Sequence, residues 1–382
     1  MRCLRVFSVA LAAVLGFVLI AAASAAATAG PKVSTVVSGL DNPRDLAFAP
    51  DGRLYVAEAG HGGSECVSGG EEGTTCVGFT SGISRVNVWA GSSQRVVSGL
   101  ASFADETGSA ATGVDGISFR GRSLFGIMTG SPDAIPPGLS DATTTMLEQQ
   151  AGQLVRVRHD GEVEFVAGVG HEDYTWSAEH ADLVPGQFPD ANPYAVLALR
   201  DAIWVVDAGS NTIDRIGRDG KVNIVAFIPN PPSSDAVPTC IDIGPDGALY
   251  IGELTGGGNA PGSSVVWRLT RRGHELTQWA TGLTAVTGCG FGRDGKFYAT
   301  EFSTAGLDNA APGTGAVVRV PPHSTSPTTV VSNLNFPGGF AAGWDGSLFV
   351  SNWSISPATG GQAPSGEVVR ISLRSRHHHH TH

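Results

Sequence analysis

The sequence has few basic residues, and little charge of either sign. It has 24 Lys and Arg against 35 Asp and Glu, a formal net charge of −11, and only 15% of its residues are charged. Binding to nucleic-acid phosphates needs basic surface, so this balance argues against a nucleic-acid partner. Low charge together with 52 Gly and many Val and Thr favours an all-β protein with many tight turns.

Long hydrophobic runs are absent after the first thirty residues. Residues 1–29 combine two early Arg, an apolar run at 6–20 and a stretch of small residues, the pattern of a secretory signal peptide. Cleavage is expected after Ala25 or Ala29. An uncleaved anchor is the alternative, although the run is short for a spanning helix of ~20 residues. We therefore expect a secreted, extracytoplasmic mature protein with no transmembrane segment.

The sequence also lacks the familiar catalytic signatures. It contains no GxSxG, no P-loop and no Cys-x-x-Cys. "HEDYT" at 171–175 lacks the second His of a zinc-binding HExxH helix. The Gly cluster "GCGFG" at 288–292 falls within an expected strand, whereas a dinucleotide fingerprint needs a following helix. No enzyme class follows from these motifs.

Cysteine is scarce: there are five, and Cys3 falls in the expected signal peptide. An even number in an exported protein suggests disulfides. Cys66 and Cys76 lie close together in the Gly-rich stretch "SECVSGGEEGTTCVG", and we expect them to close that loop. Cys240 and Cys289 either pair with each other or stay as buried free thiols, and the sequence leaves both outcomes open.

A repeat runs through the rest of the sequence. Four copies contain Asp-Gly: "LAFAPDGRLYVAE" at 46–58, "IDIGPDGALYIGE" at 241–253, "CGFGRDGKFYATE" at 289–301 and "GFAAGWDGSLFVSN" at 339–352. Two more have lost it: "GISFRGRSLFGIM" at 116–128 and "AVLALRDAIWVVD" at 195–207. Each copy predicts a strand, a tight turn and a second strand, with Asp-Gly in a two-residue hairpin turn.

A third and a fourth strand follow each copy. The third is marked by an Arg between apolar residues, and these marker arginines are Arg85, Arg156, Arg215, Arg268, Arg319 and Arg370. Segments such as "QRVVSGL" and "TTVVSNL" form the fourth. Six units of four antiparallel strands predict a six-bladed β-propeller, with an open solenoid as the alternative.

The two ends of the repeat array favour the propeller. The sixth unit has no fourth strand after Arg370, whereas "VSTVVSGL" at 33–40 is a fourth strand with no unit before it. An N-terminal strand that completes the last blade leaves no free sheet edge between first and last units. We therefore expect one six-bladed β-propeller over 30–376, closed by its N-terminal strand. A His-rich tail follows at 377–382.

Two segments resemble known proteins. "VVDAGSNTIDRIGRDGKV" at 205–222 resembles an NHL repeat. The pattern "GLDNPRDLAFAPDGRLYVAEAG", followed by a Cys-containing Gly-rich loop and "GISRV", is similar to the bacterial ScyD/ScyE family of exported proteins. The resemblance covers nearly the whole mature chain and implies a six-bladed propeller outside the cytoplasm. It implies no catalytic residues, because the family has no agreed catalytic motif.

A propeller of this topology has two unlike faces. The Asp-Gly turns and the turns between third and fourth strands share one face, here called the turn face. All long insertions fall on the other, here called the loop face: 59–81, 129–151, 167–190, 254–263, 302–313 and 353–364. Loops of this length are uncommon unless functional or disordered, so we expect the loop face to bind a ligand.

Acidic residues are expected at the channel mouth on that face. Asp45 and Asp115 fall at matching positions at the start of the first strand, where the other units have Tyr194, Cys240, Gly288 and Gly339. The second strands end in Glu58, Glu253 and Glu301, or in Asp207. Such carboxylates could bind Ca²⁺, which could then polarise a carbonyl or activate a water. Alternatively, the second-strand acids pair with the marker arginines or with loop backbone N–H groups.

The insertion at 171–190 holds His171, His180 and Trp176 beside several acids. These residues either supply ligands or an acid–base pair, or belong to a solvated loop that the Trp holds in place by packing.

Two functions remain open. One is a monomeric binding or scaffold protein that holds a small molecule, glycan or protein on the loop face. The alternative is an exported metal-dependent hydrolase, of lactonase or esterase type, with Asp45 and Asp115 at its centre.

Overall fold

The computed structural model describes residues 30–70, 73–232, 234–258, 260–356 and 364–373. The expected signal peptide at 1–29 and the His-rich tail at 377–382 lie outside this part of the chain.

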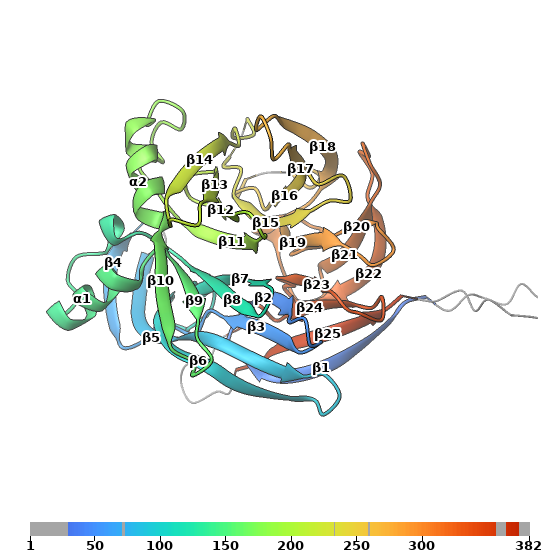
Figure 1. Cartoon of the computed structure of the whole chain (residues 1–382), viewed down its shortest axis with the longest axis horizontal. Coiled ribbons are helices and arrows are strands. Elements are labelled where there is room, and N and C mark those ends of the chain that lie inside the picture. Colours follow the sequence, from blue (N-terminus) through green and yellow to red (C-terminus); the bar gives the residue numbers. More distant parts are fainter. Residues whose placement is uncertain (1–29, 71–72, 233, 259, 357–363, 374–382) are drawn as a thin grey trace, which may run out of the picture. The chain divides into compact units, whose positions relative to one another are not determined.

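The described chain forms six antiparallel sheets, blades 1 to 6, arranged around a common centre (Figure 1). Blade 1 contains β2 (Pro43–Phe48), β3 (Leu54–Glu58), β5 (Gly73–Asn87) and β6 (Ser92–Ala104), with β4 (Glu65–Gly70) added beside β5. Blade 2 contains β7 (Val114–Arg120), β8 (Ser123–Met128), β9 (Gln153–Val157) and β10 (Val163–Gly168). Blade 3 contains β11 (Pro193–Ala198), β12 (Ile203–Asp207), β13 (Thr212–Ile216) and β14 (Val222–Phe227).

The remaining blades follow the same order from the centre outward. Blade 4 contains β15 (Pro238–Ile243), β16 (Leu249–Glu253), β17 (Ser264–Leu269) and β18 (Leu276–Leu283). Blade 5 contains β19 (Val286–Phe291), β20 (Phe297–Glu301), β21 (Gly315–Val320) and β22 (Thr328–Leu334). Blade 6 contains β23 (Phe340–Ala342), β24 (Leu348–Asn352), β25 (Gly366–Ser372) and β1 (Lys32–Leu40). The expected all-β, six-bladed propeller with four antiparallel strands per blade is confirmed.

The first and last strands of the described chain lie in one sheet. β1 pairs antiparallel with β25, from Lys32 opposite Ser372 to Leu40 opposite Gly366. Each inner strand also contacts the inner strand of the next blade, from β2 through β7, β11, β15 and β19 to β23, which contacts β2.

The hydrophobic core is divided among the interfaces between blades. Six clusters of buried apolar side chains each join two successive blades, for example Trp204 of β12 with Ile251 and Trp267 of blade 4. Both faces of each sheet are therefore covered, which explains why the strands carry apolar residues in runs as well as in alternation.

The Asp-Gly turns differ from the expected two-residue turns. In blade 1 the Ala49 N–H donates to the carbonyl O of Arg53, and the Gly52 N–H donates to the carbonyl O of Ala49. The loop thus has three residues, and only its Gly has a positive φ, 83°. Asp51 instead accepts a hydrogen bond from the Arg53 N–H at 3.1 Å. Pro50 fixes a negative φ and suits this wider turn.

The insertions on the loop face contain regular structure that the sequence did not predict. β4 and the start of β5 form a hairpin in which Cys66 stands directly opposite Cys76, and the expected disulfide joins them. Helix α1 (Asp141–Gln150) and the short 3₁₀ turn Pro132–Ala134 occupy the next insertion. Helix α2 (Val169–Glu179) occupies much of the segment expected to be a loop. A second 3₁₀ turn covers Leu307–Asn309.

Some insertions are fastened to each other. Glu65 of β4 accepts hydrogen bonds from the N–H of Ser140 at 2.8 Å and from the hydroxyl of Thr143 at 2.6 Å, at the start of α1.

Among the described residues, no helix is both long and apolar enough to cross a membrane.

Candidate ligand site in the central channel

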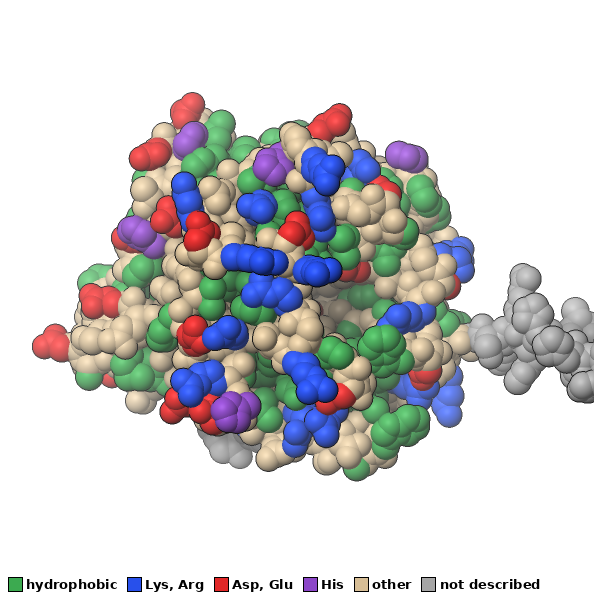
Figure 2. Space-filling model, in the orientation of Figure 1, with side chains coloured by type: hydrophobic (Ala, Val, Ile, Leu, Met, Phe, Trp, Pro, Cys, Tyr) green, Lys and Arg blue, Asp and Glu red, His purple; other side chains and the backbone are tan. Residues whose placement is uncertain are grey.

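The six inner strands surround a cavity of about 290 Å³. At its loop-face end, four polar side chains are buried: Arg44, Asp115, Thr239 and Thr287. At its turn-face end, four apolar side chains are partly exposed: Phe48, Phe119, Ile243 and Phe291. The cavity therefore opens on the turn face. The face seen in Figure 2 is hollowed near its centre, with Arg and Lys side chains around the hollow.

Arg44 closes the loop-face end of the channel. Its guanidinium donates a hydrogen bond to the carbonyl O of Ala111, and its Nε lies 3.6 Å from Oδ1 of Asp115. Burial raises the pKa of Asp115 to about 6, against the opposing effect of Arg44. Burial also raises the pKa of the neighbouring Tyr194 to about 12. The ion pair and the bond to Ala111 hold these side chains as a floor to the cavity, although Nε of Arg44 and Oδ2 of Asp115 have no hydrogen-bond partner among the described residues.

Asp45 and Asp242 line the cavity above this floor. Asp45 accepts backbone hydrogen bonds from Leu46, at 2.8 Å, and from Ile117 of blade 2, at 3.1 Å. Asp242 accepts them from Ile243, at 2.8 Å, and from Phe291 of blade 5, at 2.7 Å. Each carboxyl thus connects its own inner strand to that of the next blade.

Both carboxyl groups have a pKa raised well above the usual value for Asp. Burial, with a smaller contribution from the charge of Asp242, raises the pKa of Asp45 to about 7 against the opposing effect of its two backbone hydrogen bonds. Burial raises the pKa of Asp242 to about 6. The two residues belong to blades 1 and 4, which stand opposite each other in a ring of six. A small molecule in the cavity would have a carboxyl group on either side.

Asp45 and Asp115 do not occupy matching positions. Leu46 pairs with Val56, whereas Ile117 pairs with Gly126. The turn of blade 2 is one residue shorter than that of blade 1. When the two sequence copies are aligned from end to end, each inner-strand residue of blade 2 is therefore matched with a residue of blade 1 one position too far along the chain. Gly116 therefore stands at the level of Asp45, and Asp115 stands at the level of Arg44. The same offset in blade 3 puts Ala195 at the level of Asp45 instead of Tyr194.

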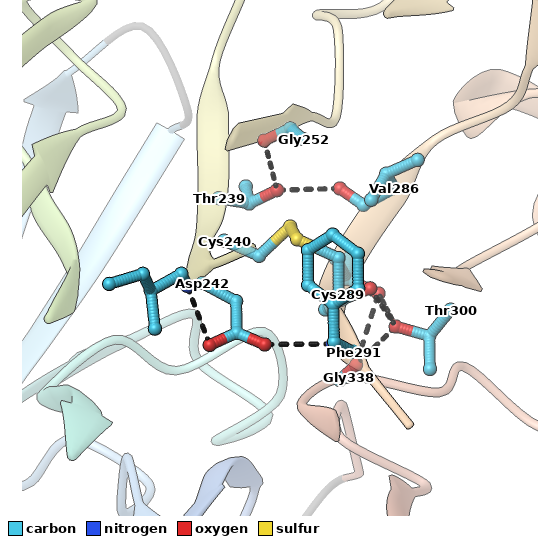
Figure 3. The surroundings of a disulfide bond; sticks show 12 residues. Thr239, Cys240, Asp242, Gly252, Val286, Cys289, Phe291, Thr300 and Gly338 are labelled. Carbon is cyan, nitrogen blue, oxygen red and sulfur yellow. Dashed lines mark hydrogen bonds between the residues drawn. A yellow bond between two sulfur atoms is a disulfide. The ribbon is translucent and has the colours of Figure 1, made fainter. Parts of the chain in front are cut away.

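A second disulfide crosses the channel wall. It joins Cys240 of β15 to Cys289 of β19, the inner strands of blades 4 and 5. Figure 3 shows it beside the Asp242–Phe291 hydrogen bond and the Thr239 hydroxyl, which donates to the carbonyl O of Val286 at 2.6 Å. The pairing that the sequence left open is thus established, and blades 4 and 5 are linked both covalently and by hydrogen bonds.

The second-strand acids are engaged with the backbone. Glu58 accepts from the Asp41 N–H at 2.7 Å, and Glu301 accepts from the Thr284 N–H at 2.9 Å. Glu253 accepts from the Val265 N–H at 3.0 Å and from the indole N–H of Trp267 at 2.7 Å. Burial raises the pKa of Glu253 and of Glu301 to about 7. These contacts favour a structural role, in which the acids fasten the segments at the loop-face end of each blade.

The marker arginines do not meet these acids, because they lie at the opposite end of the blade. Arg268 instead pairs with Asp246 of the Asp-Gly turn, at 2.7 Å, and Arg370 pairs with Asp345 of the corresponding turn in blade 6. Glu58 does have an arginine partner, Arg95 of β6, at 3.1 Å.

The two candidate histidines serve separate contacts. His171 Nδ1 lies 2.7 Å from Oδ2 of Asp133. His180 Nδ1 lies 2.8 Å from the carbonyl O of Trp176, and its ring stacks on the indole with centroids 4.3 Å apart. His171 lies in the first turn of α2, whereas His180 directly follows its last residue, so α2 holds these two rings at its opposite ends.

A buried carboxyl cluster lies away from the channel in blade 3. Asp173 of α2 lies close enough to Asp207 and Asp214 for their charges to act on it, and all three side chains are fully buried. Burial raises the pKa of Asp173 and of Asp214 well above the usual range, and the neighbouring carboxylates raise that of Asp173 further. Asp207 accepts three backbone N–H groups, from Asn192, Gly209 and Ser210.

None of the described residues form a trio of His, Cys, Asp or Glu side chains that could hold a metal ion. Sequence reasoning had not singled out Arg44, Asp242 or the Asp173 cluster. Asp242 could have been found from its position on the inner strand of an Asp-Gly copy. Asp173 could not, because it meets its partners only through the placement of α2.

Comparison with known protein families finds no match, and no curated protein is similar in sequence. Solved structures share the fold. A putative oxidoreductase (glucose dehydrogenase) from Thermus thermophilus has a TM-score of 0.55 at 16% identity, covering 90% of this chain and 100% of that one. A gluconolactonase from Xanthomonas campestris has a TM-score of 0.52 at 11% identity, covering 90% of each chain. The aldose sugar dehydrogenase of Streptomyces coelicolor has a TM-score of 0.51 at 14% identity, covering 91% and 99%. At these identities the likeness concerns the fold alone.

Proposed function

We propose that this chain is an exported, ScyD/ScyE-like propeller that binds a small polar molecule in its central channel, admitted from the turn face. The observation that carries the proposal is the pair Asp45 and Asp242, two carboxyl groups that line one cavity from opposite blades. Ligand pockets combine an apolar lining with a few fixed polar groups, and this channel has both. Two disulfides are typical of proteins that work outside the cytoplasm.

The ligand class follows from the chemistry of the two carboxyl groups. Their oxygens already accept one backbone N–H each, and each oxygen has further lone-pair capacity. They suit a molecule that donates hydrogen bonds through hydroxyl or ammonium groups. A cavity of about 290 Å³ limits the ligand to a small molecule such as a monosaccharide or polyol.

The experiment is a thermal-shift and calorimetric survey of sugars, sugar lactones, polyols and amines. A ligand of the channel should raise the melting temperature of the native protein, and Asp45→Asn or Asp242→Asn should weaken its binding about tenfold or more. Asp219→Asn, an exposed change in a turn of blade 3, is the matched control. A ligand whose affinity both channel variants leave unchanged would place the site elsewhere.

The loop face has a different role in this proposal. Its insertions are fastened to each other through Glu65 and α1 and through His171 and Asp133. We propose it as a scaffold surface for a protein or glycan, on an otherwise monomeric molecule.

A hydrolase is the second candidate, and the pKa values of Asp45 and Asp242 favour it. Groups with pKa values of about 7 and about 6 can accept and return a proton near neutral pH. A lactone or ester substrate should then be hydrolysed with a rate that Asp45→Asn abolishes. Calorimetric titration with Ca²⁺ tests the metal-dependent version, and absence of heat together with an unchanged melting temperature would exclude it.

A further inference from the structure

The basic side chains of this acidic protein lie almost entirely at one end of the blades. Among the described residues, every Arg and Lys except Arg44 and Arg95 lies in a turn of the turn face or within a few residues of one. The eighteen are Lys32, Arg53, Arg85, Arg120, Arg122, Arg156, Arg158, Arg200, Arg215, Arg218, Lys221, Arg268, Arg271, Arg272, Arg293, Lys296, Arg319 and Arg370.

Acidic residues do not cancel this charge. Ten lie at the same end: Asp51, Asp160, Glu162, Glu164, Asp201, Asp219, Asp246, Glu275, Asp294 and Asp345. Eighteen basic residues less ten acidic ones leave the turn face with a formal charge of +8. The rest of the described chain has twenty-three acidic residues and two basic ones, or −21. The propeller is therefore strongly polarised along its axis, and Figure 2 shows the basic face.

Several of these cations have no acidic partner. Within the described ranges, Arg122, Arg200 and Arg272 are exposed and form no ion pair. They project from turns of blades 2, 3 and 4. The unpaired charge is thus spread around the ring and does not line a single groove.

The two most exposed large apolar side chains of the described chain lie on the same face. Trp89, in the turn between β5 and β6, is 89% exposed, and Trp344, in the turn between β23 and β24, is 57% exposed. Arg293 covers one face of the Trp344 ring, with its guanidinium carbon 4.0 Å from the ring centroid. Tryptophan is the side chain enriched at the membrane–water interface, because its ring is apolar and its N–H is polar.

We propose that the turn face docks on the surface of an anionic lipid bilayer, with Trp89 and Trp344 entering the headgroup region and the unpaired arginines facing the lipid phosphates. Basic clusters are attracted to anionic leaflets, and partly inserted aromatic side chains add apolar burial to that attraction. The acidic loop face would then point away from the bilayer.

A lipid surface fits these residues better than a soluble anionic polymer does. A linear polyanion would need basic side chains in one line along the protein surface, whereas the unpaired arginines are distributed over several blades. Arg293 also occupies a ring face of Trp344 on which a sugar would stack. The proposal uses no residue of the cavity, but docking would cover the channel opening, because the cavity opens on the same face.

Co-sedimentation of the purified protein with vesicles tests it. The protein should sediment with vesicles of phosphatidylcholine and phosphatidylglycerol, should remain in solution with phosphatidylcholine alone, and should be released by high salt. Arg122→Gln with Arg200→Gln should lower the bound fraction several-fold. Thr145→Glu with Gln149→Glu, at exposed positions of α1, changes the net charge equally and should bind like the native protein.

The tryptophans separate the possible partners. Trp89→Ala with Trp344→Ala should weaken vesicle binding at least several-fold, while binding to dextran sulfate, a soluble polyanion, should change little. Equal loss in the arginine variant and in its α1 control would overturn the proposal, since net charge would then explain the binding. So would vesicle binding that the tryptophan variant leaves unchanged, because that result would indicate a general polyanion surface.

Discussion

Three aspartate side chains share the interior of blade 3 without a cation beside them among the described residues. Asp173 reaches the pair from α2, while Asp207 and Asp214 come from adjacent strands. Three buried charges so close together would be very costly, so at least one carboxyl group keeps its proton. A protonated Asp173 can donate a hydrogen bond to either neighbour.

This arrangement predicts a pH-dependent stability. The pKa values of Asp173 and Asp214 are raised in the folded protein, so their stabilising effect is full at low pH and is lost as pH rises through those values. Asp173→Asn keeps the shape and donates an N–H at every pH. We expect it to raise stability by ~1–2 kcal/mol at pH 8 and by less at pH 5, as measured by urea unfolding.

Asp182→Asn, at an exposed position after α2, should change stability little at either pH. A loss of stability in Asp173→Asn that is equal at both pH values would contradict the proton-sharing account.

At the scale of single residues, the sequence placed one acid near the channel but not at its correct level or among its correct neighbours. Asp45 was expected at the loop-face mouth of the channel, whereas it lines a cavity that Arg44 closes at that end. Asp115 was assigned to the same level because a one-residue difference in turn length is invisible when copies of equal length are aligned. Arg44 was overlooked, since nothing local indicates that it meets a carboxyl group from the next blade.

At the scale of elements, strands were predictable and inserted helices were not. The strand pattern recurs six times at matching positions of the repeat, so each copy strengthens the strand prediction for the others. α1 and α2 occur once each, in insertions that the other blades lack. Their sequences are therefore not repeated, and no second copy supports the prediction of a helix. α1 does have a recognisable start, with Ser140 accepting a hydrogen bond from the Thr143 N–H at 3.3 Å.

The two disulfides should differ in their effect on stability. Cys240 and Cys289 are separated by 49 residues and Cys66 and Cys76 by 10. In the chain-entropy description, closing these loops stabilises by about 4 and about 3 kcal/mol respectively. We expect Cys240→Ala with Cys289→Ala to lower the free energy of unfolding more than Cys66→Ala with Cys76→Ala does, as measured by urea titration.

The channel disulfide should also affect ligand binding, because it fixes the two inner strands that carry Asp242 and Phe291. The outer disulfide serves as the matched control, since it joins neighbouring strands of one hairpin on the loop face. Equal losses in both double variants would indicate that loop length does not govern their contribution.

At the scale of the whole molecule, β1 stands out because it belongs to blade 6 by pairing and precedes blade 1 by sequence. Deletion of 31–40 should expose the edge of β25 and cause loss of the folded monomer, as judged by circular dichroism and size-exclusion chromatography. Deletion of 377–382 should have little effect and is the control. A synthetic peptide of 31–40 added to the shortened protein should restore part of the folded signal.

A shortened protein that stays monomeric and keeps its native melting temperature would show that β1 is dispensable.

The number of blades was predictable from the repeats alone. The face on which the channel opens was not predictable. It depends on Arg44 and Asp115 filling the loop-face end, while the apolar side chains at the turn-face end stay partly exposed.

The pairing of β1 with β25 also constrains how such a gene can change its number of repeats. Adding a unit that begins with an inner strand after β25 would separate a blade from its outer strand, because β1 leads directly into blade 1. The repeat that can be gained or lost is therefore one that begins with a fourth strand and ends with a third, as the described chain itself does from β1 to β25. A change in this phase leaves every blade with four strands and keeps the pairing that closes the ring.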